Sequence, residues 1–183
     1  MKRMIIYLVS GLLVLIAAVF ITASFQSNNF RLERSMTTNA SASQAFVVLS
    51  DLHRFSEWSP WAKLDPQMKI EFAGAAAGPG SLYSWDGNDK VGSGRMTITE
   101  VQADKEVTVK LEFMRPFPST NKTIWKIEDE GAQRRVTWIM EGTYESIVPK
   151  VFGLVMNMDK IVGNQFAEGL SALKVILETN QPS

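Results

Sequence analysis

The longest apolar run in the chain lies near its N-terminus. Twenty consecutive residues, Met4 to Ala23, carry no charge. A helix of that length rises about 30 Å, which is the thickness of the hydrocarbon core of a bilayer. The apolar region of a cleavable signal peptide is shorter, about 7–15 residues, and ends in small residues. Bulky Phe20, Ile21 and Phe25 surround Ala23 here. The pattern favours a membrane-spanning anchor over a cleaved signal.

Basic residues flank this run unevenly. Lys2 and Arg3 come directly before it, and Arg31 and Arg34 follow at a greater distance. Because Lys and Arg concentrate on the cytoplasmic side of a membrane span, we expect a single-pass protein of the plasma (inner) membrane with a cytoplasmic N-terminus. The rest of the chain is then extracytoplasmic. The absence of Cys excludes disulfides and fits an oxidising compartment without requiring one.

Beyond the run, the apolar residues change to a period of two. We expect residues 1–28 to form the anchor and a short linker, and residues 29–183 to form one domain. Alternation of apolar and polar positions predicts strands with one apolar face, and it occurs at 30–37, 68–72, 82–85, 95–101, 107–113, 123–127 and 136–140. Since only short turns separate most of these strands, they must be antiparallel neighbours. The domain should contain a curled sheet of six to seven strands.

Three further segments have helical patterns. Ser41 and Gln44 form a capping-box motif that opens a first helix, and a second short helix is expected over 51–57, stopped by Pro60. From Pro149 onward, apolar residues recur every three or four positions for about seven turns, at Val151, Val155, Met158, Val162, Phe166, Leu170, Leu173 and Leu177. Such a helix must bury its apolar face, and the concave side of the sheet is the partner large enough.

Several short motifs resemble a known superfamily. Residues 45–52 (AFVVLSDL), the Trp58-Ser59-Pro60-Trp61 segment and Gly78-Pro79-Gly80 are similar to the SRPBCC superfamily, and more narrowly to its polyketide cyclase/dehydrase and lipid-transport group, related to START domains. The resemblance covers residues 30–177. It implies an α+β helix-grip fold, in which the sheet wraps around the long C-terminal helix and leaves a cavity between them. The superfamily contains binding proteins, cyclases and chaperone-like members, so the fold does not choose a function.

Aromatic and Met side chains are the candidate lining of that cavity. The expected lining residues are Trp85, Phe113, Trp125, Trp138 and Met140 on the strands, and Phe152, Met156 and Met158 in the first turns of the long helix. Buried Trp needs a partner for its N–H, and Met adapts to irregular apolar guests. Ordinary core packing is the alternative for each. Trp58 and Trp61 are expected to pack at the corner where the short helices meet the sheet. Gly169 is on the apolar face of the long helix, where its missing side chain either lets the sheet approach closely or leaves empty space.

The sequence offers few groups for catalysis. His53 is the only histidine, and His53, Asp51 or Tyr83 could transfer protons in a cyclase or dehydratase. The alternative for His53 is a plain surface histidine. No set of residues has metal-ligand spacing, and no G-x-S-x-G nucleophile motif occurs. We therefore expect no metal and no cofactor, and the pattern favours a binding protein over an enzyme.

Charge excludes one class of partner. The chain has 19 basic and 19 acidic residues, and no run or stripe of Lys and Arg. Nucleic-acid binding needs concentrated positive charge, so it is not expected.

The sequence favours a membrane-anchored binding or carrier domain for a lipid, quinone or polyketide-like molecule. The alternatives are a cyclase or dehydratase using the same cavity, and a protein-interaction module whose cavity is filled; the sequence identifies no protein partner.

Overall fold

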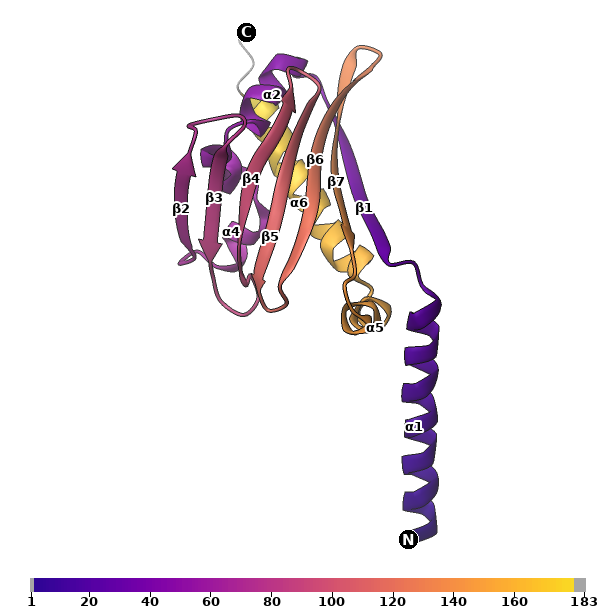
Figure 1. The fold of residues 1–183 in the computed structure, drawn as a ribbon. Helices are drawn as coiled ribbons and strands as arrows, with labels where there is room; N and C mark the ends of the chain where they lie inside the picture. The colour runs from indigo at the N-terminus through magenta and orange to yellow at the C-terminus, as the bar shows by residue number, and fades with distance from the viewer. Residues whose placement is uncertain (1, 180–183) are drawn as a thin grey trace.

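A single antiparallel sheet organises the structure. The computed structural model describes residues 2–179, apart from the side chains of Leu154, Val155 and Met158. The sheet has seven strands in the order β1-β7-β6-β5-β4-β3-β2 (Figure 1). The strands are β1 (Asn29–Thr38), β2 (Lys69–Gly74), β3 (Ser81–Asp86), β4 (Ser93–Gln102), β5 (Glu106–Arg115), β6 (Ser119–Glu130) and β7 (Gln133–Thr143). The predicted α+β fold with a curved antiparallel sheet of six to seven strands is confirmed, and the sheet has seven.

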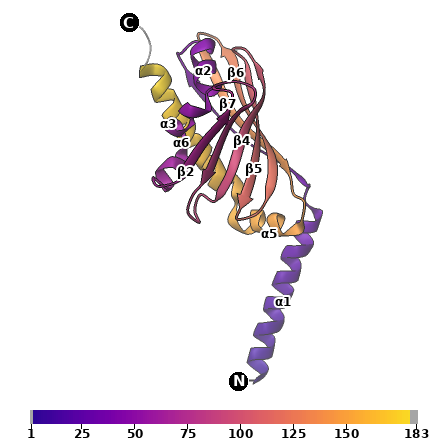
Figure 2. The same ribbon diagram turned by 60° about the vertical axis from the view of Figure 1, so that its left-hand side comes forward.

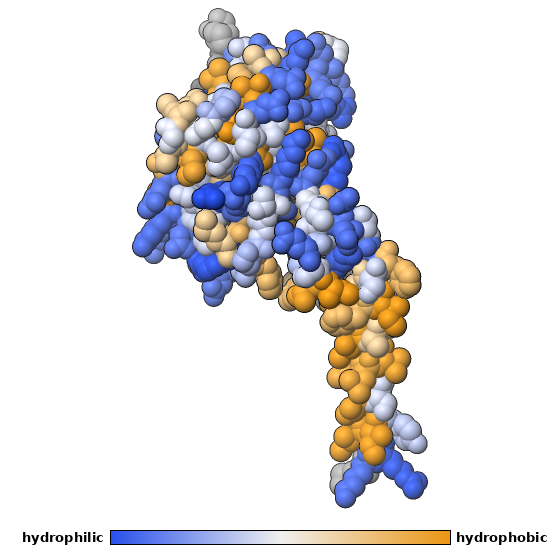
Figure 3. Space-filling model, viewed as in Figure 1, coloured by the Kyte–Doolittle hydropathy of each residue, from blue (hydrophilic) through white to orange (hydrophobic). Residues whose placement is uncertain are grey.

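Helices cover only one face of this sheet. The helices of the described chain are α1 (Lys2–Phe25), α2 (Ala42–Leu49), the 3-10 turn η1 (Leu52–Arg54), α3 (Phe55–Trp58), α4 (Pro60–Leu64), α5 (Ile147–Met156) and α6 (Met158–Thr179), of which α1 and α5 lie away from this face. Turning the molecule shows α6 crossing the concave side of the sheet, with α2 and α3 on the same side (Figure 2). The opposite face of the sheet is largely hydrophilic (Figure 3).

Local chemistry explains where the first helices begin and end. The Ser41 hydroxyl accepts from the Gln44 amide at 3.2 Å and the Gln44 side chain accepts from the Ser41 amide at 2.8 Å, so the predicted capping box opens α2. Pro60 was expected to stop the next helix. The structure differs, because α3 ends at Trp58 and Pro60 occupies the first turn of α4. Proline suits that position, where its missing N–H would have no helical partner.

The long C-terminal pattern is two helices rather than one. It begins at Ile147, before Pro149, and is interrupted at Asn157, whose φ of 47° is left-handed. Asn tolerates this conformation better than most residues. Its side-chain oxygen also accepts the Lys160 amide at 3.1 Å, which caps the start of α6. Only α6 lies across the sheet, and α5 lies at the end of the sheet beside α1 (Figure 1).

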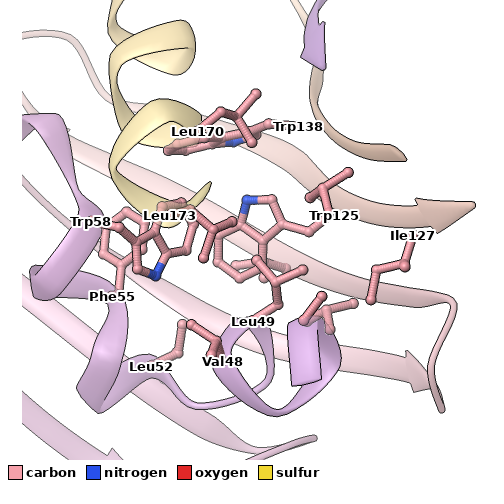
Figure 4. Packing of buried hydrophobic residues seen from close by; sticks show 14 of the residues in the cluster. Val48, Leu49, Leu52, Phe55, Trp58, Trp125, Ile127, Trp138, Leu170 and Leu173 are labelled. Carbon is pink, nitrogen blue, oxygen red and sulfur yellow. The ribbon is translucent and has the colours of Figure 1, made fainter. Parts of the chain in front are cut away.

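The core lies between the sheet and the covering helices. Trp58, Trp125 and Trp138 meet edge to face in its centre, with centroids 5.2–6.1 Å apart. Leu170 and Leu173 of α6 and Leu49 of α2 pack around them (Figure 4). At Gly169 an added Cβ would lie 2.9 Å from the Trp138 ring. Gly169 therefore allows the helix to approach the sheet closely and leaves no space of its own.

The N-terminal helix projects away from the rest of the molecule. It is long and apolar enough to cross a membrane, and its side chains are exposed along almost its whole length (Figure 3). Three residues separate its end from β1, which pairs with β7 from Asn29 to Thr38. The anchor candidate is thus connected directly to an edge strand of the sheet.

Candidate functional site

A pocket of about 340 Å³ lies between the concave face of the sheet and the first half of α6. Its volume is at the lower end of the range of small-molecule sites, about 300–1,000 Å³. Its wall is mainly aromatic and aliphatic, with contributions from β3, β5, β7, α3, α4 and α6 that include Phe55, Trp61, Tyr83, Trp85, Phe113, Trp138, Met140, Val162 and Phe166. Met96 of β4 also lines the pocket, so apolar side chains from seven elements enclose it.

The inner end of the pocket is built from aromatic rings. Trp138 of β7 stacks on Phe166 of α6, and Trp61 meets the Trp138 ring edge-on at 5.8 Å. The period-two pattern of β7 points Trp138 and Met140 to the same face, and the helical spacing of α6 brings Val162 and Phe166 opposite them. Rings held in these contacts have few rotamers, so this end of the pocket is preformed.

The outer end of the pocket lies at the end of the sheet that carries the β3–β4 and β5–β6 loops. Lys90, Val91 and Pro116 line it from the β3–β4 and β5–β6 loops, and Ile161 lines it from the start of α6. Lys90, Pro116 and Ile161 are exposed, whereas the residues of the inner end are largely buried. The mouth is therefore at the end of the sheet where α5 lies and α1 departs (Figure 1).

Polar groups in the wall are few. Burial raises the pKa of the Tyr83 phenol, and a hydrogen bond with Ser56 acts in the opposite direction. The phenol stays protonated at neutral pH and can donate a hydrogen bond. Among residues 2–179, the Ser59 hydroxyl, the Thr123 hydroxyl and the Trp138 indole N–H have no hydrogen-bond partner. All three residues line the pocket.

The structure brings together four of the eight residues expected to line a pocket. Trp85, Phe113, Trp138 and Met140 share one wall. Trp125 instead lies fully buried in the core, against Trp58. Phe55 and Trp58 of α3 pack against the Trp125 ring. The residue of β6 that lines the pocket is Thr123, two positions earlier on the same face.

The expected lining residues at the start of the long helix are placed differently. Phe152 and Met156 are on α5, about half exposed and outside the pocket. The left-handed Asn157 turns α5 away from the direction of α6. The side chain of Met158 lies outside the described residues. Phe55, Trp61, Val162 and Phe166 line the pocket without having been expected to, although the apolar stripe of α6 already placed Val162 and Phe166 against the sheet.

The catalytic candidates do not converge. The Asp51 carboxylate accepts the His53 amide at 2.9 Å and lies 3.1 Å from His53 Nδ1. The His53 ring is half exposed and stacks on Phe72, with centroids 4.2 Å apart. Neither His53 nor Asp51 lines the pocket, and only Tyr83 does. Asp51 acts as a cap for η1, which accounts for its position. Within residues 2–179, no group of three acidic or histidine side chains could hold a metal ion.

Comparisons with known proteins agree with this architecture. The family model described as polyketide cyclase / dehydrase and lipid transport matches residues 29–178. No curated protein sequence matches the chain significantly. Among solved structures, protein CV1439 from Chromobacterium violaceum is 14% identical with a TM-score of 0.57, over 85% of this chain and 99% of its own.

Two other solved structures show how varied the proteins with this fold are. The Aha1 dimer from Colwellia psychrerythraea is 16% identical with a TM-score of 0.56, covering 84% of this chain and 99% of its own. The di-domain ARO/CYC StfQ from the steffimycin biosynthetic pathway is 11% identical with a TM-score of 0.60, covering 82% of this chain and 51% of its own. At these identities the likeness is one of fold alone.

Proposed function

The chain belongs to the polyketide cyclase / dehydrase and lipid transport family, and from this premise we propose that it is a membrane-anchored domain that binds and carries an apolar small molecule. The observation that carries the proposal is the pocket of about 340 Å³ between the sheet and α6. Apolar walls with a few polar groups are typical of small-molecule sites. The open volume also argues against the alternative of an interaction module with a filled cavity.

The size and chemistry of the pocket restrict the guest. The volume suits one acyl or isoprenoid chain, or a compact ring system such as a quinone or polyketide, better than a lipid with two long chains. Tyr83 lines the pocket, and its protonated phenol can donate a hydrogen bond. This group favours a guest that carries one polar end.

The membrane part of the proposal rests on α1. Residues 1–28 would form the anchor and linker, and residues 29–183 the binding domain. Lys2 and Arg3 precede the span, which favours a cytoplasmic N-terminus and a domain outside the plasma (inner) membrane. If α1 were instead a signal sequence, the mature protein would begin after the apolar run. The intact mass of the protein purified from membranes distinguishes the two, because the anchor requires the full N-terminus.

The binding proposal can be tested by filling the pocket. Val162 lines the pocket on α6, whereas Val175 on the same helix is 63% exposed. Val162→Trp should exclude the guest, and Val175→Trp is the matched control. The full chain of each variant would be purified from membranes, extracted with organic solvent and analysed by mass spectrometry.

We expect one apolar species enriched in the wild type and in V175W, and reduced at least about tenfold in V162W, because the loss of about 1.4 kcal/mol of apolar contact already has that effect. Circular dichroism of V162W would verify that it is folded. The proposal fails if all three proteins carry the same mixture of bulk lipids in the same amounts.

A further inference from the structure

An exposed apolar surface lies at the end of the domain that carries α1. Val148, Phe152 and Met156 recur every fourth residue on α5, so they share one helix face, and they are 45%, 49% and 51% exposed. Phe117 of the β5–β6 loop is also 51% exposed, and its ring lies 5.6 Å from that of Phe152. We call these four residues the α5 apolar surface. Figure 3 shows hydrophobic residues gathered at this end of the domain, beside the top of α1.

The rest of α5 is fixed to the end of α1. The Lys150 side chain is buried and donates a hydrogen bond to the Gln26 carbonyl at 3.0 Å, one residue beyond α1. A Lys at that position also interacts favourably with the negative end of a helix dipole. Ala23, on the last turn of α1, is fully buried, and α1 and α5 are in contact. The segments that follow α1 and precede α5 are also joined, because the Tyr144 amide donates to the Asn28 carbonyl at 2.7 Å.

These contacts set the height of α5 relative to a bilayer. The apolar run of α1 ends at Ala23, and a run of its length matches the hydrocarbon core, about 30 Å thick. Gln26 and Lys150 would then lie at the level of the lipid headgroups. A Lys whose stem is buried while its amine reaches a polar partner is common at that depth. Because α5 lies beside the end of α1 (Figure 1), its exposed face is at the same level, and Phe25, the last residue of α1, is 88% exposed.

The α5 apolar surface also adjoins the pocket mouth. Pro116 lines the pocket and is followed directly by Phe117. Ile161 lines the pocket from the first turns of α6, four residues after Asn157 ends α5, and its side chain is 41% exposed. Apolar side chains thus continue from the outer end of the pocket to the exposed face of α5, and no charged residue of α5 interrupts them.

We propose that the α5 apolar surface lies in the interfacial layer of the bilayer that α1 spans, and that it holds the pocket mouth against the lipids. The inference rests on the proposed anchoring by α1. A bilayer is the occupant that the observations favour, because the surface is continuous with the span and is pinned to its end. Amphipathic helices with large apolar side chains such as Phe on one face bind at this depth in lipid.

Site-specific spin labels can test this in the full chain, because the protein contains no Cys. Single variants Val148→Cys, Phe152→Cys and Phe117→Cys would be labelled and reconstituted in phosphatidylcholine vesicles. Ser10→Cys, in the middle of α1, is the reference for a position inside the bilayer. Ala132→Cys, in the exposed β6–β7 turn at the opposite end of the sheet, is the reference for water. Relaxation by oxygen and by a water-soluble nickel complex reports the depth of each label.

We expect the labels at 148, 152 and 117 to be relaxed more by oxygen than by nickel, with a depth between those of the two references. The V148C protein retains Phe152, so its result does not depend on the loss of that ring. Labels at 148, 152 and 117 that behave like the one at 132, while the label at 10 is inside the bilayer, would overturn the inference and leave the anchor in place. A label at 10 in water would overturn both. Labels in lipid on a protein whose pocket carries no enriched species would support the inference and count against the carrier function alone.

Discussion

The indole ring of Trp138 lies face to face against the phenyl ring of Phe166, with the centroids 4.2 Å apart and the planes 9° from parallel. This contact joins β7 to α6 and forms the inner wall of the pocket. Both residues are almost fully buried. The same pair therefore holds the helix on the sheet and forms one side of the pocket, so the stability of the domain and the proposed binding depend on a shared contact.

Replacing Phe166 by Ala should destabilise the domain by about 3–5 kcal/mol, since it removes a buried aromatic ring and leaves a cavity. Denaturant unfolding of the full chain in detergent, followed by tryptophan fluorescence, measures the change. Val175→Ala, at an exposed position of the same helix, is the control and should fall within about 0.5 kcal/mol of the wild type. Equal midpoints for F166A and V175A would contradict the assignment of the stack as a core contact.

Gly169 and Gly153 form a matched pair of helical glycines. An added Cβ at Gly169 would lie 2.9 Å from the Trp138 ring, whereas at Gly153 its nearest neighbour is the Tyr144 hydroxyl at 3.6 Å. Gly153→Ala should stabilise the protein by up to about 1 kcal/mol through helix propensity. Gly169→Ala should destabilise it by about 1–3 kcal/mol, because the core is already filled. Thermal unfolding of both variants tests this, and a stabilised G169A would show that α6 has room to move.

Substitutions of Asp51 can distinguish a role as the cap of η1 from a catalytic role. Asp51→Ala removes the side chain that accepts the His53 amide, so we expect a loss of about 1 kcal/mol in unfolding free energy. Asp51→Asn keeps a good cap and should lose much less. In all of D51A, D51N and His53→Ala, the species extracted from the pocket should be unchanged. Altered chemistry of that species in both D51N and H53A would instead favour proton transfer by these residues.

Glu112 should make the free energy of unfolding depend on pH between its ordinary pKa of 4.5 and its pKa of about 2 in the folded protein. Hydrogen bonds from Arg95 at 2.7 Å and Lys110 at 2.9 Å hold the pKa of Glu112 at about 2, against an ordinary value of 4.5. Because the folded-state pKa is lowered, the stabilisation is present above about pH 4.5 and is lost as the pH falls toward 2. The pair lies at the surface, so its contribution is at most about 1 kcal/mol.

Comparison with Glu112→Gln isolates this contribution. The wild type should be the more stable protein at pH 7, and the difference should shrink between pH 4.5 and pH 2 when unfolding is measured in parallel. A difference that stays constant over this range would assign the effect to packing rather than to charge.

Much of the fold can be predicted from the periodicity of apolar residues, but the residues that line the pocket cannot. One apolar face per strand imposes a period of two, so the strands could be predicted from alternation alone. Trp125 and Trp138 have the same pattern and face the same side, yet α2 and the other short helices cover one part of the sheet and leave space at another. Which inward residue meets the pocket depends on that coverage, which is a property of tertiary packing.

The break between α5 and α6 at Asn157 could not be predicted from the sequence, for a different reason. Apolar residues continue at helical spacing on both sides of it, and the change of direction comes from one left-handed residue. Asn is compatible with a helix interior as well as with a helix end, so the sequence alone does not decide between one helix and two. The consequence was the misplacement of Phe152 and Met156.

On the proposed anchoring by α1, the connection between α1 and β1 limits how far the domain can lie from the membrane. Three residues join them, and three extended residues span about 10 Å. Because β1 is paired with β7 from Asn29 to Thr38, its residues do not add to the length of this connection. A domain held by α1 would therefore exchange its guest with the membrane in which it is embedded, and it could not travel to an opposing one. Delivery to a distant surface would require a second, mobile acceptor that comes to this protein.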